Sequence, residues 1–164
     1  MSSFEETYGV SAQKAQLLTQ AFGNYIAARV LFNTGCHVEA LHLSADCIER
    51  IMKACLIGLE YPKETKMGVE MSSHDLDSLR IIFGHDLIKL YNDIRNRNIV
   101  ILTEKLEENL HYMNRYHKEV RYPGLLRGGI SYSPKNMGEL DKLFFELLMA
   151  LKLQDHYFYR STFA

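Results

Sequence analysis

The sequence lacks the features that mark membrane-bound or exported proteins. None of its 164 residues belong to an apolar run long enough to span a membrane, and no basic stretch precedes an apolar core at the N-terminus. We therefore expect no membrane association. The net charge is only −1, so the molecule as a whole has no attraction to nucleic acid. Any site for a polyanion must be a local patch.

Cysteine is scarce, and its positions do not form a framework. Cys36, Cys47 and Cys55 are odd in number and have no C-x-x-C spacing, which argues against a disulfide framework. The second and third lie in a helical pattern, where a cysteine usually acts as a small buried hydrophobic residue. We expect a reduced, cytoplasmic protein.

Well-known catalytic motifs are also missing. No serine lies in a nucleophile-elbow context, no glycine-rich loop matches a phosphate cradle, and no cysteine is paired with a plausible base. Internal repeats and low-complexity tracts are absent too. We expect no bound cofactor.

What the sequence does contain is typical of one folded helical domain over residues 1–164. Its composition, 47% hydrophobic and 24% charged, is that of a globular rather than a disordered chain. The spacing of the apolar residues predicts five helices, at about 12–33, 38–59, 75–98, 103–119 and 135–158. Because the links are short, neighbouring helices should pack antiparallel. The predicted fold is therefore all-α, an up-and-down antiparallel bundle of about five helices.

The second helix has the clearest pattern. Its apolar residues alternate steps of four and three, which keeps them on one face: Leu41, Ala45, Ile48, Met52, Cys55 and Leu59. The third helix has a possible bend at Gly84. Residues 61–73 are polar and weakly patterned, so we interpret them as a long loop, a kind of segment that is often functional.

Two His-Asp-Leu steps stand near predicted helix starts, at His74-Asp75-Leu76 and at His85-Asp86-Leu87. An aspartate at a helix start accepts hydrogen bonds from unpaired backbone N–H groups and suits the positive end of the dipole. We favour this capping role for His74 and Asp75. For His85 and Asp86, which follow Gly84, a capping role and a place in a binding site both stay open.

Basic residues gather at the ends of the third and fourth predicted helices. They are Arg95, Arg97, Arg115, His117, Lys118, Arg121 and Arg127. Arginine suits bidentate contacts with phosphate, whereas cations at a helix C-terminus can also merely offset its dipole. Arg121 and Tyr122 stand apart, because the proline that follows fixes their turn. Nearby tyrosines, Tyr116 among them, could stack on a base or simply pack.

A Glu-x-x-His pattern occurs twice, at Glu39–His42 and at Glu108–His111. Di-metal helical bundles use two such motifs together with a lone glutamate from each of two further helices. The first predicted helix and residues 85–98 contain no glutamate. We therefore expect no metal centre of this kind.

Four segments together resemble the HEPN superfamily, the helical domains named for higher eukaryotes and prokaryotes nucleotide-binding. They are residues 25–32 (YIAARVLF), 47–54 (CIERIMKA), 84–87 (GHDL) and 121–123 (RYP). The resemblance covers about residues 15–158. It implies a helical bundle that usually dimerises. Members of the superfamily bind nucleotides, act as partners of nucleotidyltransferase domains, or act as metal-independent ribonuclease toxins.

The ribonuclease branch of that superfamily depends on an arginine and a histidine with four to six residues between them. Arg97 and Arg121 have no histidine at that distance, and Arg80 with His85 is a formal match whose intervening residues are apolar. The leading hypothesis is therefore a non-catalytic, homodimeric module that binds a nucleotide or another phosphate-bearing ligand. A ribonuclease using Arg80, His85 or His117, and a partner protein for a nucleotidyltransferase, are the alternatives.

In the leading hypothesis Arg121 contacts phosphate, Tyr122 or Tyr116 stacks on a base, and His85 with Asp86 orders the opposite wall. The expected ligand-binding residues are His85, Asp86, Arg115, Tyr116, Arg121 and Tyr122.

Overall fold

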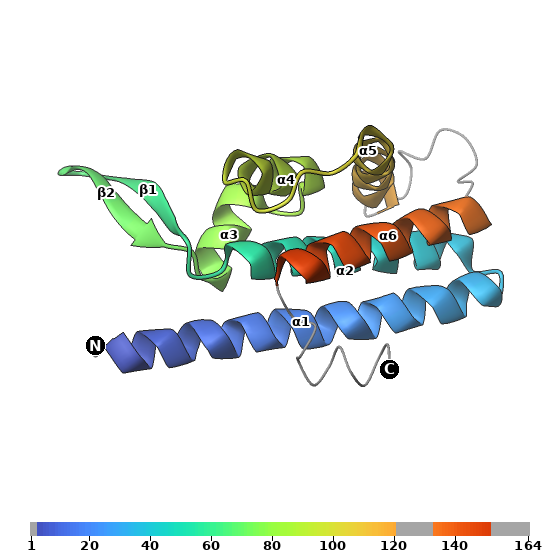
Figure 1. The fold of residues 1–164 in the computed structure, drawn as a ribbon, viewed down its shortest axis with the longest axis horizontal. Coiled ribbons are helices and arrows are strands. Elements are labelled where there is room, and N and C mark those ends of the chain that lie inside the picture. Colours follow the sequence, from blue (N-terminus) through green and yellow to red (C-terminus); the bar gives the residue numbers. More distant parts are fainter. Residues whose placement is uncertain (1–2, 121–132, 152–164) are drawn as a thin grey trace.

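The computed structural model describes the backbone of residues 3–120 and 133–151, and the side chains of 12–118 and 133–151. These residues form six helices and one two-stranded sheet (Figure 1). The elements are α1 (Ser3–Asn33), α2 (His37–Leu56), β1 (Glu60–Thr65), β2 (Gly68–Ser73), α3 (Leu76–Phe83), α4 (Leu87–Asn96), α5 (Glu104–Val120) and α6 (Pro134–Ala150). The helical class is confirmed, whereas the expectation of a purely helical five-helix bundle is wrong.

Helix α2 is the centre of the fold. It contacts α1, α4, α5 and α6, and thirteen of its twenty residues are buried. The predicted apolar stripe is confirmed as far as Cys55, since Leu41, Ile48 and Met52 are almost completely excluded from solvent. Its last member, Leu59, lies beyond the end of α2. Because nearly every face of α2 meets another helix, charged residues on it are also drawn into the core.

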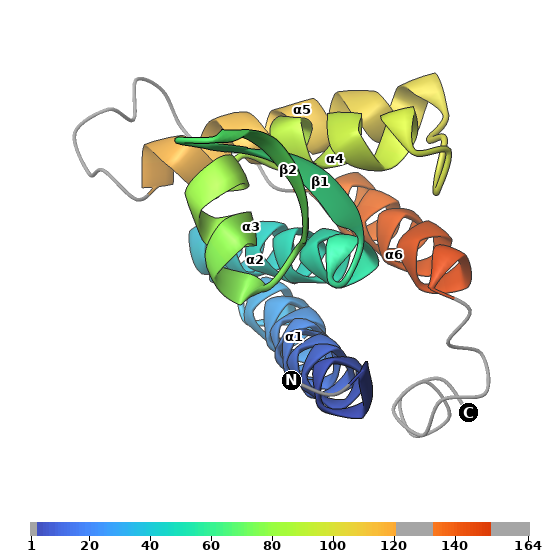
Figure 2. The same cartoon turned by 90° about the vertical axis from the view of Figure 1, so that its left-hand side faces the viewer.

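The helices do not all run up and down. Helices α1 and α2 lie side by side in opposite directions, and α6 lies beside them (Figure 1). Helices α4 and α5 instead lie across this layer, so that α5 is seen end-on in Figure 1 and lengthwise in Figure 2. Tyr25 of α1 stacks on Phe144 of α6, with ring centres 4.4 Å apart. The crossing brings the start of α4 and the last turns of α5 over α2.

The single helix expected at 75–98 is two helices. Gly84 ends α3 with a φ of +57°. Residues other than glycine rarely adopt this backbone conformation. Each helix then has its own N-cap. Asp75 accepts from the backbone of Ser78 at the start of α3, and Asp86 accepts from Ile88 and Lys89 at the start of α4. The capping role expected of Asp75 is confirmed, and Asp86 also caps a helix.

The expected loop at 61–73 is a β-hairpin instead. Strands β1 and β2 pair antiparallel from Glu60 with Ser73 to Thr65 with Gly68. Gly68 has a φ of +123°, which lets the chain turn. The hairpin shows only the short alternation of Val69 and Met71 with polar residues, and both of these side chains are exposed. Because most of its residues face solvent, neither strand requires an apolar face that a sequence pattern would reveal. The hairpin projects from one end of the molecule (Figure 1).

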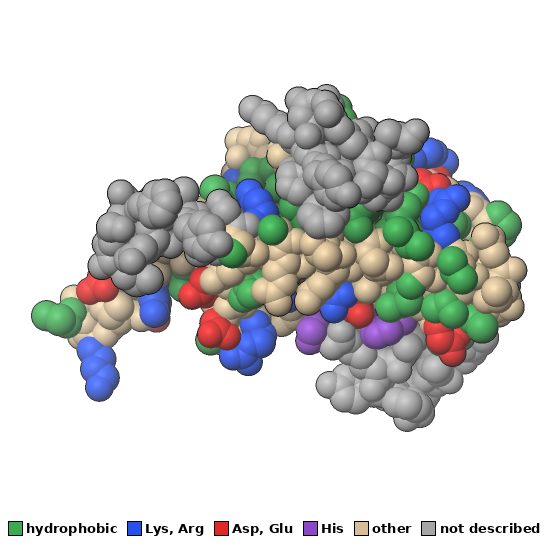
Figure 3. Space-filling view, turned by 90° about the horizontal axis from the view of Figure 1, so that it is seen from below, with side chains coloured by type: hydrophobic (Ala, Val, Ile, Leu, Met, Phe, Trp, Pro, Cys, Tyr) green, Lys and Arg blue, Asp and Glu red, His purple; other side chains and the backbone are tan. Residues whose placement is uncertain are grey.

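Helix α1 forms one side of the molecule and starts earlier than expected, at Ser3. It ends at Asn33, as predicted, and Gly35 follows with a φ of +84°. Ile26 and Val30 are more than half exposed, and Figure 3 shows hydrophobic side chains scattered over this face. The fifth predicted helix corresponds to α6, and its expected end at 152–158 lies outside the described residues. Among the described helices, none is both long and apolar enough to cross a bilayer.

Candidate functional site

A charged pair lies inside the core on α2. Glu49 and Lys53 are one helical turn apart and only 6% and 8% exposed. The Lys53 ammonium donates to Glu49 Oε1 over 2.7 Å and to the carbonyl of Gly84 over 2.8 Å. The second bond ties α2 to the turn between α3 and α4. A buried ion pair is retained only when such contacts compensate its lost hydration.

His85 lies directly beside this pair. Its Nδ1 is 3.1 Å from each oxygen of the Glu49 carboxylate. An ionised carboxylate only accepts hydrogen bonds, so Nδ1 carries the proton in this contact. The ring is 52% exposed, and Nε2 has no hydrogen-bond partner within the described part of the chain. Glu49 therefore holds the ring in place and leaves its second nitrogen available.

His117 approaches the same carboxylate from α5. It is completely buried, with Nε2 3.3 Å from Glu49 Oε2 and 3.6 Å from Asp46 Oδ1. Its Nδ1 is buried and has no partner among residues 12–118 and 133–151. The ring stacks on His42 with centres 5.2 Å apart. We call Glu49, Lys53, His85 and His117 the Glu49 network.

Opposing effects set the ionisation of Glu49. Burial raises the pKa of its carboxyl, but hydrogen bonds from His117 and Lys53 and the charges of Lys53 and His85 outweigh burial and bring the pKa to about 2. Glu49 is thus a buried carboxylate that stays ionised at neutral pH. It is able to hold cations and N–H donors against α2.

Asp86 lies next to the Glu49 network in the chain and has a separate set of partners. Its Oδ2 accepts from the Lys118 ammonium over 2.9 Å, and its Oδ1 accepts from the Asn114 amide over 3.3 Å. Burial raises the pKa of Asp86, yet the bonds from Lys118 and from backbone N–H groups of α4 give a net lowering. Lys118 is about half exposed, so an ammonium and the imidazole of His85 both reach the surface near the start of α4.

The structure groups only some of the residues expected from the sequence. His85 and His117 both contact Glu49, whereas Asp86 follows His85 in the chain and bonds to Lys118, Asn114 and the start of α4. Arg115 instead lies over the ring of Tyr116, 5.6 Å from its centre. Successive helical residues are about 100° apart, which turns Tyr116 well away from Asn114 and Lys118, whereas Arg115 is only about 60° from Lys118.

The remaining expected residues lie elsewhere. Arg80 is exposed, and its described ion pair is with Asp77, at 3.5 Å. His85 is engaged with Glu49, so the Arg80–His85 match does not form a contact pair. Arg121 and Tyr122 lie outside the described residues.

Sequence reasoning overlooked Glu49 and Lys53 as site residues. A signal was present, because the two charges stand four residues apart on a helix whose residues 48, 52 and 55 are apolar and inward-facing. A charged pair that shares the buried side of a helix requires polar partners in the core.

Two sets of side chains are close enough to hold a metal ion. Their potential ligand atoms lie within 4.8 Å of one another, and both sets include His117: Glu49, His85 and His117; His42, Asp46 and His117. Neither set contains both residues of a Glu-x-x-His motif. Glu39 is exposed at the start of α2, whereas His42 pairs with Asp46 over 3.7 Å.

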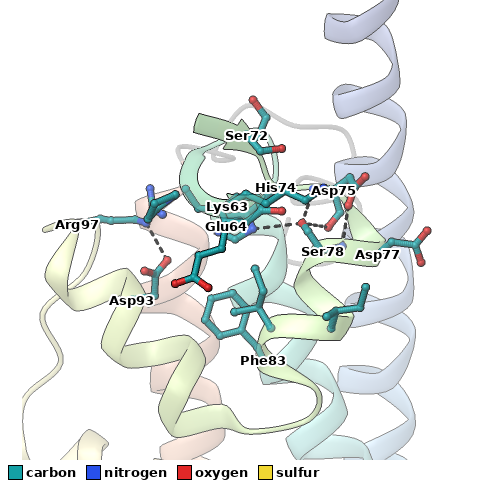
Figure 4. Close-up of a pocket in the computed structure, with 15 residues that line it drawn as sticks. Lys63, Glu64, Ser72, His74, Asp75, Asp77, Ser78, Phe83, Asp93 and Arg97 are labelled. Atoms are coloured by element: carbon teal, nitrogen blue, oxygen red, sulfur yellow. Dashed lines mark hydrogen bonds and ion pairs between the residues drawn. The ribbon is translucent and has the colours of Figure 1, made fainter. Parts of the chain in front are cut away.

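A separate pocket of about 640 Å³ lies between the hairpin, α3 and α4. His74 is buried in its wall and stacks on Tyr61, with ring centres 4.3 Å apart. Arg97 donates to Asp93 over 2.7 Å (Figure 4). The charged residues of its lining are Lys63, Glu64, Asp75, Asp77, Asp93 and Arg97. Carboxylates outnumber cations there, so the pocket does not favour an anion.

Comparison with known proteins gives no match: no family model, no curated protein and no solved structure is similar to this chain.

Proposed function

We propose that the chain is a nucleotide-binding module of the HEPN type, which holds the phosphate of its ligand at His85. The observation that supports this most is the contact of His85 Nδ1 with both oxygens of buried Glu49. This contact fixes the ring while its second nitrogen is available at a half-exposed position. A donor held in advance loses little entropy when a ligand binds.

The charge around His85 suits a phosphate. Lys118 lies beside Asp86 at the start of α4, and its ammonium is about half exposed. When His85 is protonated, its Nε2–H and the Lys118 ammonium supply two charge-assisted donors, the type of hydrogen bond that phosphate oxygens accept most strongly. When His85 is neutral, Nε2 is an acceptor and repels phosphate.

The resemblance adds further parts to this site. Arg121 would contact the phosphate, and Tyr122 would stack on the base. Tyr116 remains a second stacking candidate only if a ligand spans the flank of α5 that carries Arg115. Substitution of Arg121 by alanine should weaken binding as strongly as substitution of His85.

Calorimetric titration with ATP tests the proposal. We expect a measurable dissociation constant for the unaltered protein and at least about a tenfold weaker one for His85→Ala, since a charged hydrogen bond contributes roughly 1.5–3 kcal/mol. His111→Ala is the matched control, because His111 is an exposed histidine on α5 outside the network. Absence of binding at millimolar ATP by the folded protein, or equal binding by both variants, would contradict the proposal.

A second candidate function is metal-independent cleavage of RNA. One observation favours it: the rings of His85 and His117 lie 6.2 Å apart and both contact the same carboxylate. A histidine oriented by a carboxylate is a common general acid or base. Incubation with RNA in the presence of a chelator distinguishes the two functions. Cleavage that His85→Ala abolishes would favour the ribonuclease, and intact RNA would favour simple binding.

Assembly is also part of the proposal. We expect a homodimer in the cytoplasm, and a nucleotidyltransferase as a further partner, both on the resemblance alone. The exposed Ile26 and Val30 on α1 offer apolar surface for an association of this kind. Light scattering after size-exclusion chromatography should give twice the mass of 19.0 kDa, and a single-chain mass would contradict the dimer.

A further inference from the structure

The Glu49 network contains a set of three side chains from different parts of the fold whose donor atoms converge. Glu49 comes from α2, His85 from the turn before α4, and His117 from α5. Glu49 Oε2 lies 3.1 Å from His85 Nδ1 and 3.3 Å from His117 Nε2. A tetrahedral ion bound at about 2.1 Å by each ligand separates its ligand atoms by about 3.4 Å. The observed spacing is close to that value.

Hydrogen bonding alone does not account for His117. The ring is completely buried, and its Nε2 faces two carboxylates, with Glu49 Oε2 at 3.3 Å and Asp46 Oδ1 at 3.6 Å. A single N–H at Nε2 cannot make a good hydrogen bond to both carboxylates at once. A metal ion bound to His117 Nε2 would place a positive charge next to both Glu49 and Asp46.

The second carboxylate oxygen is already oriented. Lys53 donates to Glu49 Oε1, which leaves Oε2 toward the two histidines. A hydrogen bond that fixes a ligating carboxylate is a regular part of metal sites. His85 is half exposed and the other two ligands are buried, so an ion would enter past His85.

We propose that Glu49, His85 and His117 bind a divalent transition metal ion such as Zn²⁺. Two imidazoles and one carboxylate suit zinc and its neighbours, whereas Mg²⁺ and Ca²⁺ prefer oxygen ligands throughout. Three protein ligands leave a fourth position for water or for Asp46, whose Oδ1 is 3.6 Å from His117 Nε2. This inference does not rest on the proposed function. It uses His85 Nδ1 and leaves Nε2 available for another contact.

The test is a titration of untagged, chelator-treated protein with Co²⁺ and Zn²⁺. We expect one equivalent to bind, with the visible absorption of tetrahedral Co²⁺ and displacement by Zn²⁺. His85→Ala should weaken Zn²⁺ binding at least about tenfold, as loss of a ligand does. His111→Ala should bind as the unaltered protein does.

Three outcomes would overturn the proposal. They are no Zn²⁺ binding by the folded protein at submillimolar concentration, equal binding by the His85→Ala and His111→Ala variants, and binding that depends on His42 but not on His85. The last result would assign the ion to the other set of ligands. Because His85 is half exposed, its alanine variant should fold, and circular dichroism of the metal-free protein checks this.

Discussion

Replacement of Glu49 by glutamine is the sharpest test of how the buried charges stabilise this fold. Glutamine keeps the shape of the side chain but removes the negative charge that faces Lys53, His85 and His117. The pKa of Glu49 is lowered from 4.5 to about 2, and one pKa unit corresponds to about 1.36 kcal/mol. Ionised Glu49 therefore contributes about 3 kcal/mol to the free energy of unfolding at neutral pH.

This contribution depends on pH in a defined direction. The native chain holds the proton of Glu49 less tightly than the unfolded chain does, because its pKa is lower in the native state. The contribution is fully present above about pH 4.5 and is lost as the pH falls toward 2. The difference in stability between the unaltered protein and Glu49→Gln should shrink over the same interval.

Urea unfolding followed by circular dichroism at several pH values measures both effects. We expect Glu49→Gln to be less stable by about 3 kcal/mol at pH 7, with a much smaller difference at pH 3. Glu39→Gln is the control, because Glu39 is an exposed glutamate on the same helix. A difference below 1 kcal/mol at pH 7, or one that does not change between pH 5 and 3, would show that ionised Glu49 does not stabilise the fold.

Three further predictions concern other parts of the fold. In the folded protein Cys36 should react rapidly with a thiol reagent and the two cysteines of α2 slowly, since Cys36 alone of the three is exposed; equal rates for all three would contradict this. Asp75→Ala should lower the free energy of unfolding by about 1 kcal/mol in urea, through loss of the α3 cap, without changing ATP affinity. Burial and the bond to Asp141 raise the pKa of Tyr25 to about 12, so Tyr25→Phe should remove a component near pH 12 from the tyrosinate absorbance titration, and the stability of the unaltered protein should fall from pH 10 to 12.

The helices could be predicted from the sequence because their apolar residues recur at helical spacing. The stripe of α2 from Leu41 to Met52 is an example, and its members are buried as expected. The hairpin could not be predicted, because most of its residues face solvent and neither strand requires an apolar face that a sequence pattern would reveal. The sequence did not predict that α4 and α5 cross over α2. The angle between two packed helices depends more on their side chains than on the length of the link between them.

The candidate site was predictable only in part for a similar physical reason. Gly84, His85 and Asp86 stand out locally, since glycine permits the turn and aspartate caps the next helix. Their partners come from distant positions, with Glu49 thirty-six residues before His85. A sequence shows that Glu49 lies on an apolar helix, but only the packed fold shows which side chains meet it.

Phosphate binding at His85 can be observed by an NMR titration of protein labelled at histidine, in metal-free buffer. We predict that ATP shifts the ring resonances of His85, assigned with His85→Ala, in a saturable way, while adenosine without phosphate does not. The resonances of exposed His111 should stay in place. If the ring resonances of His85 do not shift at millimolar ATP in protein that remains folded, His85 does not bind the phosphate.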